Sequence, residues 1–413
     1  MKILVVVDSI DVNDSSGSKA NVALIHNLAA CGFEVRVLHY TQKNIPLEGI
    51  QCISIQEKKW TLSYLLSRTE RLFTRWTKIN LNPALEGFFG FSFTFFNDSS
   101  SIAAAIDKQK DFHPDWVFTL SKGASFRPHY AMLKMSQLHG KWLAYVHDPY
   151  PFHYYPRPYN WIQPGYRQKE KFFAAVAEKA KYSVFPSLLL KEWMGSYFPR
   201  FLETGIIIPH QLAFYKDSEV QLPNYFNKDH FTILHAGNLM KQRDPRFLME
   251  AFQSFLANTE GAYKDAQLVL IGSASYHKAW LERNIPKSKN VVVIYENKPF
   301  EEVLHMQKNA AVNVILESKS EISPFLPAKI PHCVLANKKL LVLGPYYSET
   351  RRLLGNDYEY WSEVDDSERI AHLITMLYGI WKKDKASLVL DRADLIAYLS
   401  ADHLKKVLTE ILY

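Results

Sequence analysis

The stretch from Phe231 to Asp244, FTILHAGNLMKQRD, brings together residue types that can hold a diphosphate. Gly237 permits a tight backbone turn after a short apolar run, and the cationic side chains of Lys241 and Arg243 follow it. The amphipathic run PRFLMEAFQSFL comes next and predicts a helix, whose N-terminal N–H groups and dipole attract anions. The stretch therefore predicts a phosphate site. An ordinary strand-to-helix corner with solvated basic residues is the alternative.

Polar side chains also follow predicted strands in the first half of the chain. His147 and Asp148 come directly after the apolar run Trp142 to Val146. A histidine there can hydrogen-bond a polar substrate or transfer a proton near neutral pH, although it can equally be a satisfied polar residue. The loop after the first predicted strand, Lys2 to Val7, contains no GxGxxG motif. It still supplies four candidate ligand contacts: Ser16, Gly17, Ser18 and Lys19.

Apolar runs of strand length alternate with amphipathic runs of helix length, which predicts an α/β protein with parallel sheets. A chain of 413 residues is expected to form two domains, and the stretch from Pro209 to Asn227 predicts the link. The strands predicted in the second half are followed by polar residues or glycines, among them Gly272, Ser273 and Glu317. The carboxyl ends of parallel strands meet at one edge of a sheet, so these residues should lie close together. Those strands are Thr232–Leu234, Gln267–Ile271, Val291–Ile294, Val312–Leu316 and Leu340–Leu343.

Composition and charge narrow the possibilities further. The net charge of +7 indicates an anionic partner without choosing among a nucleotide, a nucleic acid and lipid head groups. Cys31, Cys52 and Cys333 form no CxxC pair, which argues against a disulfide framework and a zinc site. The first apolar run stops at Asp8, and no later run reaches the roughly 18 apolar residues of a membrane span. We therefore expect a cytoplasmic protein.

The stretch from Trp60 to Asn80 has two adjoining stripes when it is wound as a helix. The apolar stripe contains Leu62, Leu65, Leu72, Trp76 and Ile79, and the basic stripe contains Arg68, Arg71, Arg75 and Lys78. This pattern is typical of a helix that lies on an anionic membrane. It also fits a surface helix packed on its own domain. The aromatic run FFGFSFTFF that follows can line an acceptor site or a core.

Four segments carry a resemblance to a known family: HAGNLMKQRDPRFLMEAF, LVLIGS, SPFLPAKIPHCVLANKKLLVLG and KYSVFPSLLLKEWMGSYF. They resemble segments of the retaining glycosyltransferases of the GT-B fold that build bacterial surface polysaccharides, most closely from Lys181 to Gly344. The resemblance implies an α/β fold with two doubly wound, Rossmann-like domains facing a central cleft. Residues 1–212 would form the acceptor domain and residues 213–395 the nucleotide-sugar donor domain, with a C-terminal helix at about 396–413 packing back on the first.

The family's donor-diphosphate contacts can be carried over to this chain. The resemblance places the glycine turn on Gly237 and one of two diphosphate cations on Arg243. Asn238 stands where the other cation would be, and Lys241 is its possible substitute. The family's proline-serine-lysine step becomes PAK here, so that Lys329 and the helix after it would contact the diphosphate.

The family's two donor-binding glutamates are absent from this chain, since Pro324 and His332 stand at their positions. His332 can hydrogen-bond a ribose hydroxyl but cannot act as a bidentate carboxylate. Glu317 or Glu321, slightly upstream, would have to replace the missing acid. The resemblance adds three further donor-side residues from the same segment, namely Ser323, Phe325 and Leu326.

The implied chemistry is transfer of a sugar from a nucleoside diphosphate sugar, such as a UDP-sugar, to a hydroxyl group with retention. The acceptor would be a carbohydrate or a lipid-linked saccharide. Arg243 and Lys329 would stabilise the leaving diphosphate, and His147 would hold a sugar hydroxyl. We expect no metal and no other cofactor, because no DxD-type acidic pair follows a strand. Nucleic acid is not an expected partner.

Two other classes of function stay open. A non-catalytic GT-B-fold partner of a glycosyltransferase would explain Pro324 and His332. A GT-B-fold sugar-nucleotide epimerase would need carboxylates and histidines in its cleft, for which the chain offers His147, His153, His210, His235 and His332. In each case we expect a cytoplasmic protein, peripheral at the inner face of the membrane if Trp60 to Asn80 binds lipid.

Overall fold

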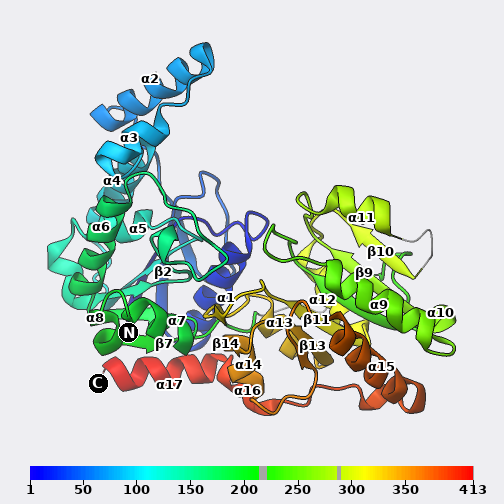
Figure 1. The fold of residues 1–413 in the computed structure, drawn as a ribbon. Helices are drawn as coiled ribbons and strands as arrows, with labels where there is room; N and C mark the ends of the chain where they lie inside the picture. The colour runs from blue at the N-terminus through cyan, green and yellow to red at the C-terminus, as the bar shows by residue number, and fades with distance from the viewer. Residues whose placement is uncertain (214–220, 286–289, 413) are drawn as a thin grey trace. The chain divides into compact units, whose positions relative to one another are not determined.

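The computed structural model describes residues 1–213, 221–285 and 290–412, which form two compact units (Figure 1). Each unit is built around its own parallel β-sheet. Unit 1 comprises Met1–Tyr155, Tyr159–Ala213 and Ser400–Tyr413, and unit 2 comprises Pro156–Pro158 and Phe214–Leu399. Part of the predicted domain link, residues 214–220, lies outside the described residues.

The sheet of unit 1 has seven strands in the order β3-β2-β1-β4-β5-β6-β7. In chain order they are β1 Lys2–Val7, β2 Glu34–His39, β3 Gln51–Ser54, β4 Trp116–Leu120, β5 Trp142–Tyr145, β6 Tyr182–Phe185 and β7 Gly205–Ile207. Alternate residues of β1 pack on opposite faces, since Leu4 and Val6 join one apolar cluster and Ile3 and Val5 join another. A strand buried on both faces explains its unbroken apolar sequence.

Helices cover both faces of this sheet. α1 (Ser16–Ala30) and α17 (Ala401–Leu412) pack on one face, where Leu404 and Leu408 of α17 enter the core. The other face carries α4 (Phe93–Asp107), α5 (Arg127–Met132), α6 (Tyr166–Lys179), α7 (Leu188–Gly195) and α8 (Arg200–Thr204). Two further helices, α2 (Leu62–Thr77) and α3 (Asn82–Phe89), project from the unit at the end of α4 (Figure 1).

The sheet of unit 2 has six strands in the order β10-β9-β8-β11-β13-β15. They are β8 Phe231–Ala236, β9 Ala266–Ile271, β10 Val291–Ile294, β11 Val312–Leu316, β13 Lys339–Leu343 and β15 Trp361–Ser362; β12 Ile322–Ser323 and β14 Tyr347–Ser348 pair separately. α9 and α15 pack on one face, and α12 packs on the other. The helices are α9 Arg246–Asn258, α10 Ala262–Asp265, α11 Lys278–Asn284, α12 Phe300–Asn309, α13 Ile330–Ala336, α14 Glu349–Leu354, α15 Ser367–Lys383 and α16 Ala393–Tyr398.

The predicted α/β class with two parallel, Rossmann-like sheets is confirmed. The five strands predicted in the second half all form, and β10 and β11 have the predicted ends. One local prediction was wrong. Ser16, Gly17, Ser18 and Lys19 are the first turn of α1 and not part of a loop, because the side chain of Ser15 caps the helix by accepting from the backbone N–H of Ser18.

Candidate functional site

The glycine turn after β8 is held tightly against the turn after β9. The N–H of Gly237 donates to Ile271 and the N–H of Leu239 donates to Ser273. The amide oxygen of Asn238 accepts from the N–H of Ser273 at 3.1 Å. Gly272 has a φ of +133°, and a Cβ there would lie 2.5 Å from the carbonyl oxygen of Gly237. The two strand ends therefore form one rigid backbone platform.

Two cations and a carboxyl group meet beside this platform. A Cβ on Gly237 would lie 2.6 Å from Nζ of Lys329, so the glycine makes room for the lysine. Arg243 is close enough to exert a Coulomb effect on both Lys329 and Glu317. Its Nε is buried and lacks a hydrogen-bond partner among the residues that the structure describes. An unsatisfied guanidinium N–H beside a second cation is suited to an anionic ligand.

Burial controls the ionisation of this cluster. Removal from water, reinforced by the positive charge of Arg243, lowers the pKa of Lys329 to about 7. Burial raises the pKa of Glu317. Burial also lowers the pKa of His235 well below its usual value, with Lys329 adding to the effect. Negative charge placed beside Lys329 would raise its pKa and favour the protonated form.

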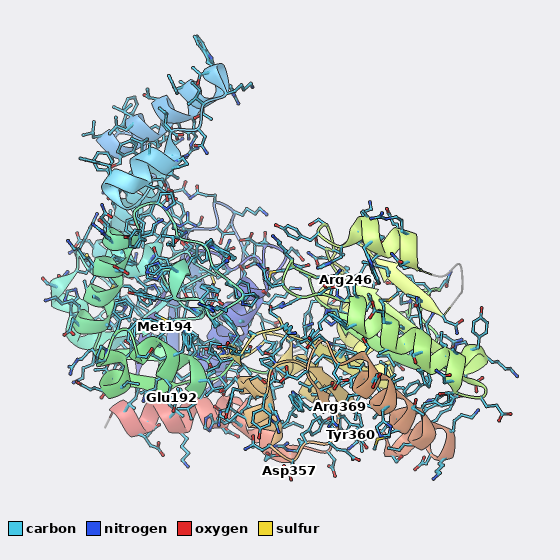
Figure 2. All side chains as sticks on the ribbon, viewed as in Figure 1. Glu192, Met194, Arg246, Asp357, Tyr360 and Arg369 are labelled. Atoms are coloured by element: carbon cyan, nitrogen blue, oxygen red, sulfur yellow. The ribbon has the colours of Figure 1, made fainter. Side chains whose placement is uncertain are left out.

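The helix predicted after the glycine turn forms as α9, and its first N–H group already has a partner. α9 starts only at Arg246, and the N–H of Arg246 already donates to the carboxylate of Asp244 at 3.0 Å. Asp244 therefore places a negative charge at the positive end of α9, and a diphosphate contact at this helix start stays a prediction. Arg246 is labelled at the start of this helix in Figure 2.

The other donor-side candidates lie at different depths. Lys241, Glu321 and Ser273 are exposed, whereas Ser323 and Leu326 are buried and Phe325 is half-buried. His332 lies on the short helix α13 and packs edge-on against the ring of Phe300 at 4.5 Å. The structure thus brings Gly237, Arg243, Lys329 and Glu317 together, and leaves Lys241 and Glu321 at the surface.

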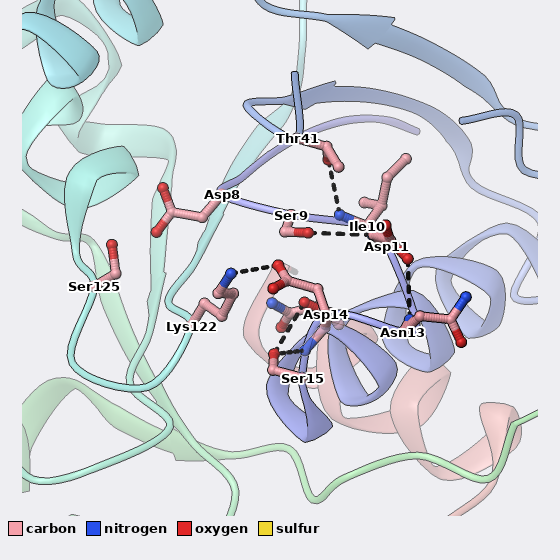
Figure 3. Close-up of polar contacts among 12 residues, drawn as sticks. Asp8, Ser9, Ile10, Asp11, Asn13, Asp14, Ser15, Thr41, Lys122 and Ser125 are labelled. Atoms are coloured by element: carbon pink, nitrogen blue, oxygen red, sulfur yellow. Dashed lines mark hydrogen bonds and ion pairs between the residues drawn. The ribbon is translucent and has the colours of Figure 1, made fainter. Parts of the chain in front are cut away.

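In unit 1, a polar network follows β1 (Figure 3). The N–H of Ile10 donates to Thr41, and the N–H of Asp11 donates to Ser9. Asp14 pairs with Lys122 from the loop after β4. Of the predicted contacts, Ser16 is exposed, Gly17 and Lys19 are half-buried, and Ser18 is buried. The loops after β1 and β4 are therefore joined at the carboxyl edge of the sheet.

His147 lies at the same edge with a defined tautomer. The side-chain N–H of Asn21 donates to the carbonyl of Ser121, which directs the amide oxygen of Asn21 toward Nε2 of His147 at 2.8 Å. Nε2 must then carry the proton, and Nδ1 is left as an acceptor without a partner among the described residues. Burial lowers the pKa of His147 well below its usual value, and His210 stacked on it adds to the effect. Asp148, next in the chain, is half-buried.

A cavity of about 370 Å³ opens beside this edge. Phe91 and Phe95, stacked at 4.1 Å, line it together with Tyr150. Arg127 also lines it and bridges Asp8 at 3.0 Å and Asp98 at 2.7 Å. The aromatic run thus contributes to both a core and a cavity wall. Aromatic faces beside fixed charges suit a polar ligand with carbon–hydrogen faces, such as a sugar.

The sequence analysis missed several residues of unit 1: Asn21, Asp98, Lys122 and Arg127. Their partners lie far away in the chain, as with Asn21 and His147 at a separation of 126. Asp8 does have a sequence signal, because it directly follows the strand Lys2–Val7 and polar residues at strand ends lie at the ligand-binding edge of such sheets. Among the described residues, no group of three or more His, Cys, Asp or Glu side chains is placed to hold a metal ion.

Comparison with protein-family models and with curated protein sequences found no match. Solved structures do match over nearly the full chain. A UDP-forming α,α-trehalose-phosphate synthase from Burkholderia xenovorans matches with a TM-score of 0.63 at 10% identity, covering 99% of this chain and 98% of that one. HepE of Anabaena in complex with UDP matches with a TM-score of 0.59 at 13% identity, covering 100% and 99%. Each is a GT-B glycosyltransferase structure.

The chain has the GT-B fold. A third structure with this fold is WaaG, a glycosyltransferase involved in lipopolysaccharide biosynthesis, with a TM-score of 0.58 at 11% identity over 98% of this chain and 99% of that one. Identities this low show the fold alone. The GT-B resemblance predicted from the four sequence segments is thereby confirmed, and the roles of individual residues stay predictions.

Proposed function

We propose that this GT-B protein transfers a sugar from a nucleoside diphosphate sugar, with UDP as the carrier, to a hydroxyl group of a carbohydrate or lipid-linked saccharide. The observation that carries the proposal is the cluster of Arg243 and Lys329 beside the glycine platform of unit 2. A diphosphate would satisfy Nε of Arg243 and supply the missing negative charge beside Lys329. The bound UDP in the HepE structure agrees with this choice of carrier.

The reaction needs charge stabilisation more than a protein base. The bond between the anomeric carbon and the donor phosphate breaks, and a bond from the same carbon to the acceptor oxygen forms on the same face. The acceptor proton passes to the departing diphosphate. Arg243 and Lys329 would stabilise the charge that develops on the diphosphate, which lowers the barrier.

Unit 1 is the proposed acceptor side. Nδ1 of His147 would accept a hydrogen bond from a sugar hydroxyl, since the tautomer set by Asn21 leaves that lone pair unused. The cavity lined by Phe91, Phe95 and Arg127 would receive a further part of the saccharide. We propose retention at the anomeric carbon, no requirement for a metal, and a place in the cytoplasm in surface polysaccharide or lipopolysaccharide synthesis.

Nucleotide binding tests the donor site first. A thermal-shift screen of the purified protein with UDP, GDP, ADP, CMP and TDP, without added metal, should give a selective rise in Tm with UDP. A ligand at about 100 times its Kd stabilises by roughly 2.7 kcal/mol. No shift with any nucleotide from a well-folded sample would argue for a non-catalytic GT-B partner instead. Hydrolysis or transfer with UDP-glucose then separates an enzyme from a binding protein.

Arg243→Ala is the sharpest variant for the phosphate assignment. We expect it to weaken UDP binding by about 1.5 to 3 kcal/mol, the range for hydrogen bonds to charged groups, as measured by calorimetric titration. Lys264→Ala is the control, because Lys264 is an exposed cation of unit 2 that is not among the candidate donor contacts. Equal affinities of the Arg243 variant and the wild type would rule out the assigned site.

A further inference from the structure

The helix α2 has its amphipathic faces reversed relative to a surface helix of a globular protein. Its residues facing the rest of unit 1 are mostly polar: Ser67 is its one buried residue, and the half-buried ones are Ser63, Tyr64, Glu70 and Thr74. Wound at about 100° per residue, the outward side forms an apolar stripe about 120° wide. The stripe contains Leu62, Leu65, Leu66, Leu72, Phe73 and Trp76, all of them exposed.

The exposure of this stripe is large. Leu62 is 73% exposed and Trp76 is 85% exposed, and Trp60 just before the helix is 93% exposed. Phe88 on α3 adds another ring at 76% exposure. Figure 1 shows that α2 projects from the rest of unit 1. Surface helices normally turn their apolar stripe inward, so that a contiguous apolar surface of this kind marks an interaction site.

Polar contacts fix the helix in this orientation. The hydroxyl of Thr61, which caps α2, donates to Asn97 of α4 at 2.6 Å. Arg71 donates to Thr94, also on α4, at 2.9 Å. Asn97 in turn donates to the carbonyl of Lys58 at 3.1 Å. The polar side of α2 is thus the side that unit 1 holds, and the apolar side is the side presented outward.

Charge identifies the kind of partner. Arg68, Arg71 and Arg75 run along one edge of the apolar stripe, and Lys58, Lys59 and Lys78 lie at its two ends, all of them exposed. From Lys58 to Phe89 the only acidic residues are Glu70 and Glu86. Glu70 lies on the inward side, and Glu86 pairs with the buried Lys169 at 3.0 Å. Glu57, just before this range, is half-buried and pairs with Arg68 at 3.5 Å. The outward surface therefore combines apolar side chains with an excess of positive charge and no exposed acid.

We propose that this surface, α2 with its flanking residues 58–61 and 78–89, docks on a lipid bilayer with anionic head groups. Tryptophans at both ends of the stripe suit the boundary between head groups and acyl chains. Arginines and lysines around the stripe suit negatively charged phosphates, each contributing about 1 kcal/mol near such a surface. A projecting convex helix fits a bilayer better than it fits the groove of a protein, which would have to enclose the apolar stripe and the cations together. The proposal does not depend on the donor or the acceptor.

Vesicle co-sedimentation of the full chain tests the proposal. We expect binding to vesicles of phosphatidylcholine with about one third phosphatidylglycerol, and little binding to phosphatidylcholine alone. Arg68→Gln with Arg75→Gln should weaken binding roughly 25-fold, about five-fold for each charge. Leu65→Ser with Trp76→Ser should weaken it about ten-fold or more for each side chain.

The control is Tyr263→Ser with Tyr276→Ser, which removes two exposed rings from unit 2 and should leave vesicle binding unchanged. Far-ultraviolet circular dichroism and Tm verify that each variant is folded. Equal binding of wild type and the Leu65/Trp76 variant would overturn the proposal, and so would no binding by the wild type. Sedimentation velocity measures the oligomeric state of each protein. If the wild type is a dimer, the Leu65/Trp76 variant is a monomer and neither binds vesicles, the surface would be assigned to a second copy of the chain.

Discussion

At the scale of single residues, the protonation state of Lys329 should depend on whether a diphosphate is bound in the proposed donor site. In the structure its ammonium group sits beside Arg243 and His235, and burial with the charge of Arg243 holds its pKa at about 7. A bound diphosphate would reverse the local charge and raise that pKa. The donor site is therefore expected to couple nucleotide binding to protonation of one lysine.

This coupling gives a prediction about protons. At pH 8, above the phosphate titration near pH 6, Lys329 is mostly neutral when free and protonated when UDP is bound. UDP binding should then take up close to one proton, and its affinity should fall about ten-fold per pH unit above the free pKa. Calorimetry in buffers with different ionisation enthalpies measures the uptake. Lys329→Arg, which stays charged, should abolish the pH dependence; an unchanged dependence would contradict the assignment.

At the scale of elements, α17 is a segment whose packing partner could not be read from its own pattern. The pattern predicted an amphipathic helix, and the structure places Leu404 and Leu408 in the core of unit 1 beside α1. The thiol of Cys31, at the end of α1, donates to the carbonyl of Ala401 at 3.1 Å. The helix α17 therefore covers, together with α1, one face of the sheet that contains β1.

Leu404→Ala tests how much unit 1 depends on this helix. Leu404 is fully buried, and we expect the loss of its side chain to destabilise unit 1 by about 2 to 5 kcal/mol, measured by urea unfolding. Glu410→Ala on the exposed side of α17 should change the free energy of unfolding by less than about 0.5 kcal/mol. Similar small effects from both variants would mean that α17 is not part of the cooperative unit.

At the scale of the whole molecule, the stability of unit 1 depends on histidines that are buried in the neutral form. His39 and His129 are fully buried, and desolvation lowers their pKa values to about 4 and about 3. In the unfolded chain each of these histidines binds a proton below about pH 6.5. In the folded chain each stays neutral until the pH reaches its lowered pKa. The contribution of these two neutral histidines to the stability of unit 1 is therefore fully present above about pH 6.5 and is lost as the pH falls toward their lowered pKa values.

Thermal unfolding as a function of pH checks this expectation. Each histidine should remove about 1.4 kcal/mol of stability for every pH unit below 6.5. Asp8 and Glu317, whose pKa values are raised by burial, act in the opposite direction at lower pH, so the useful quantity is a difference between variants. His129→Gln should flatten the pH dependence of Tm between pH 6.5 and pH 4.5. The same slope in variant and wild type would show that His129 does not titrate in this way.

Hydrophobic pattern alone predicted the two parallel sheets, most strand ends and the glycine turn at Gly237. These features are local, because a buried strand must be apolar on both faces and a tight turn needs a residue without Cβ. The GT-B fold was implied by the resemblance of four segments to a known family, and solved structures of 10% and 13% identity share that fold. Glu317 was found because strand ends meet at one edge, Arg243 because it follows the glycine turn, and Lys329 through the family resemblance.

Only the tertiary structure decided which side chains meet and which way a face points. The partnership of Asn21 with His147, and the burial that lowers the pKa of Lys329, depend on segments distant in the chain. The stripe on α2 is the clearest case. Periodicity shows that one side of a helix is apolar, but whether that side packs inward is decided by the contacts of the opposite side, here those of α4 with the polar face of α2.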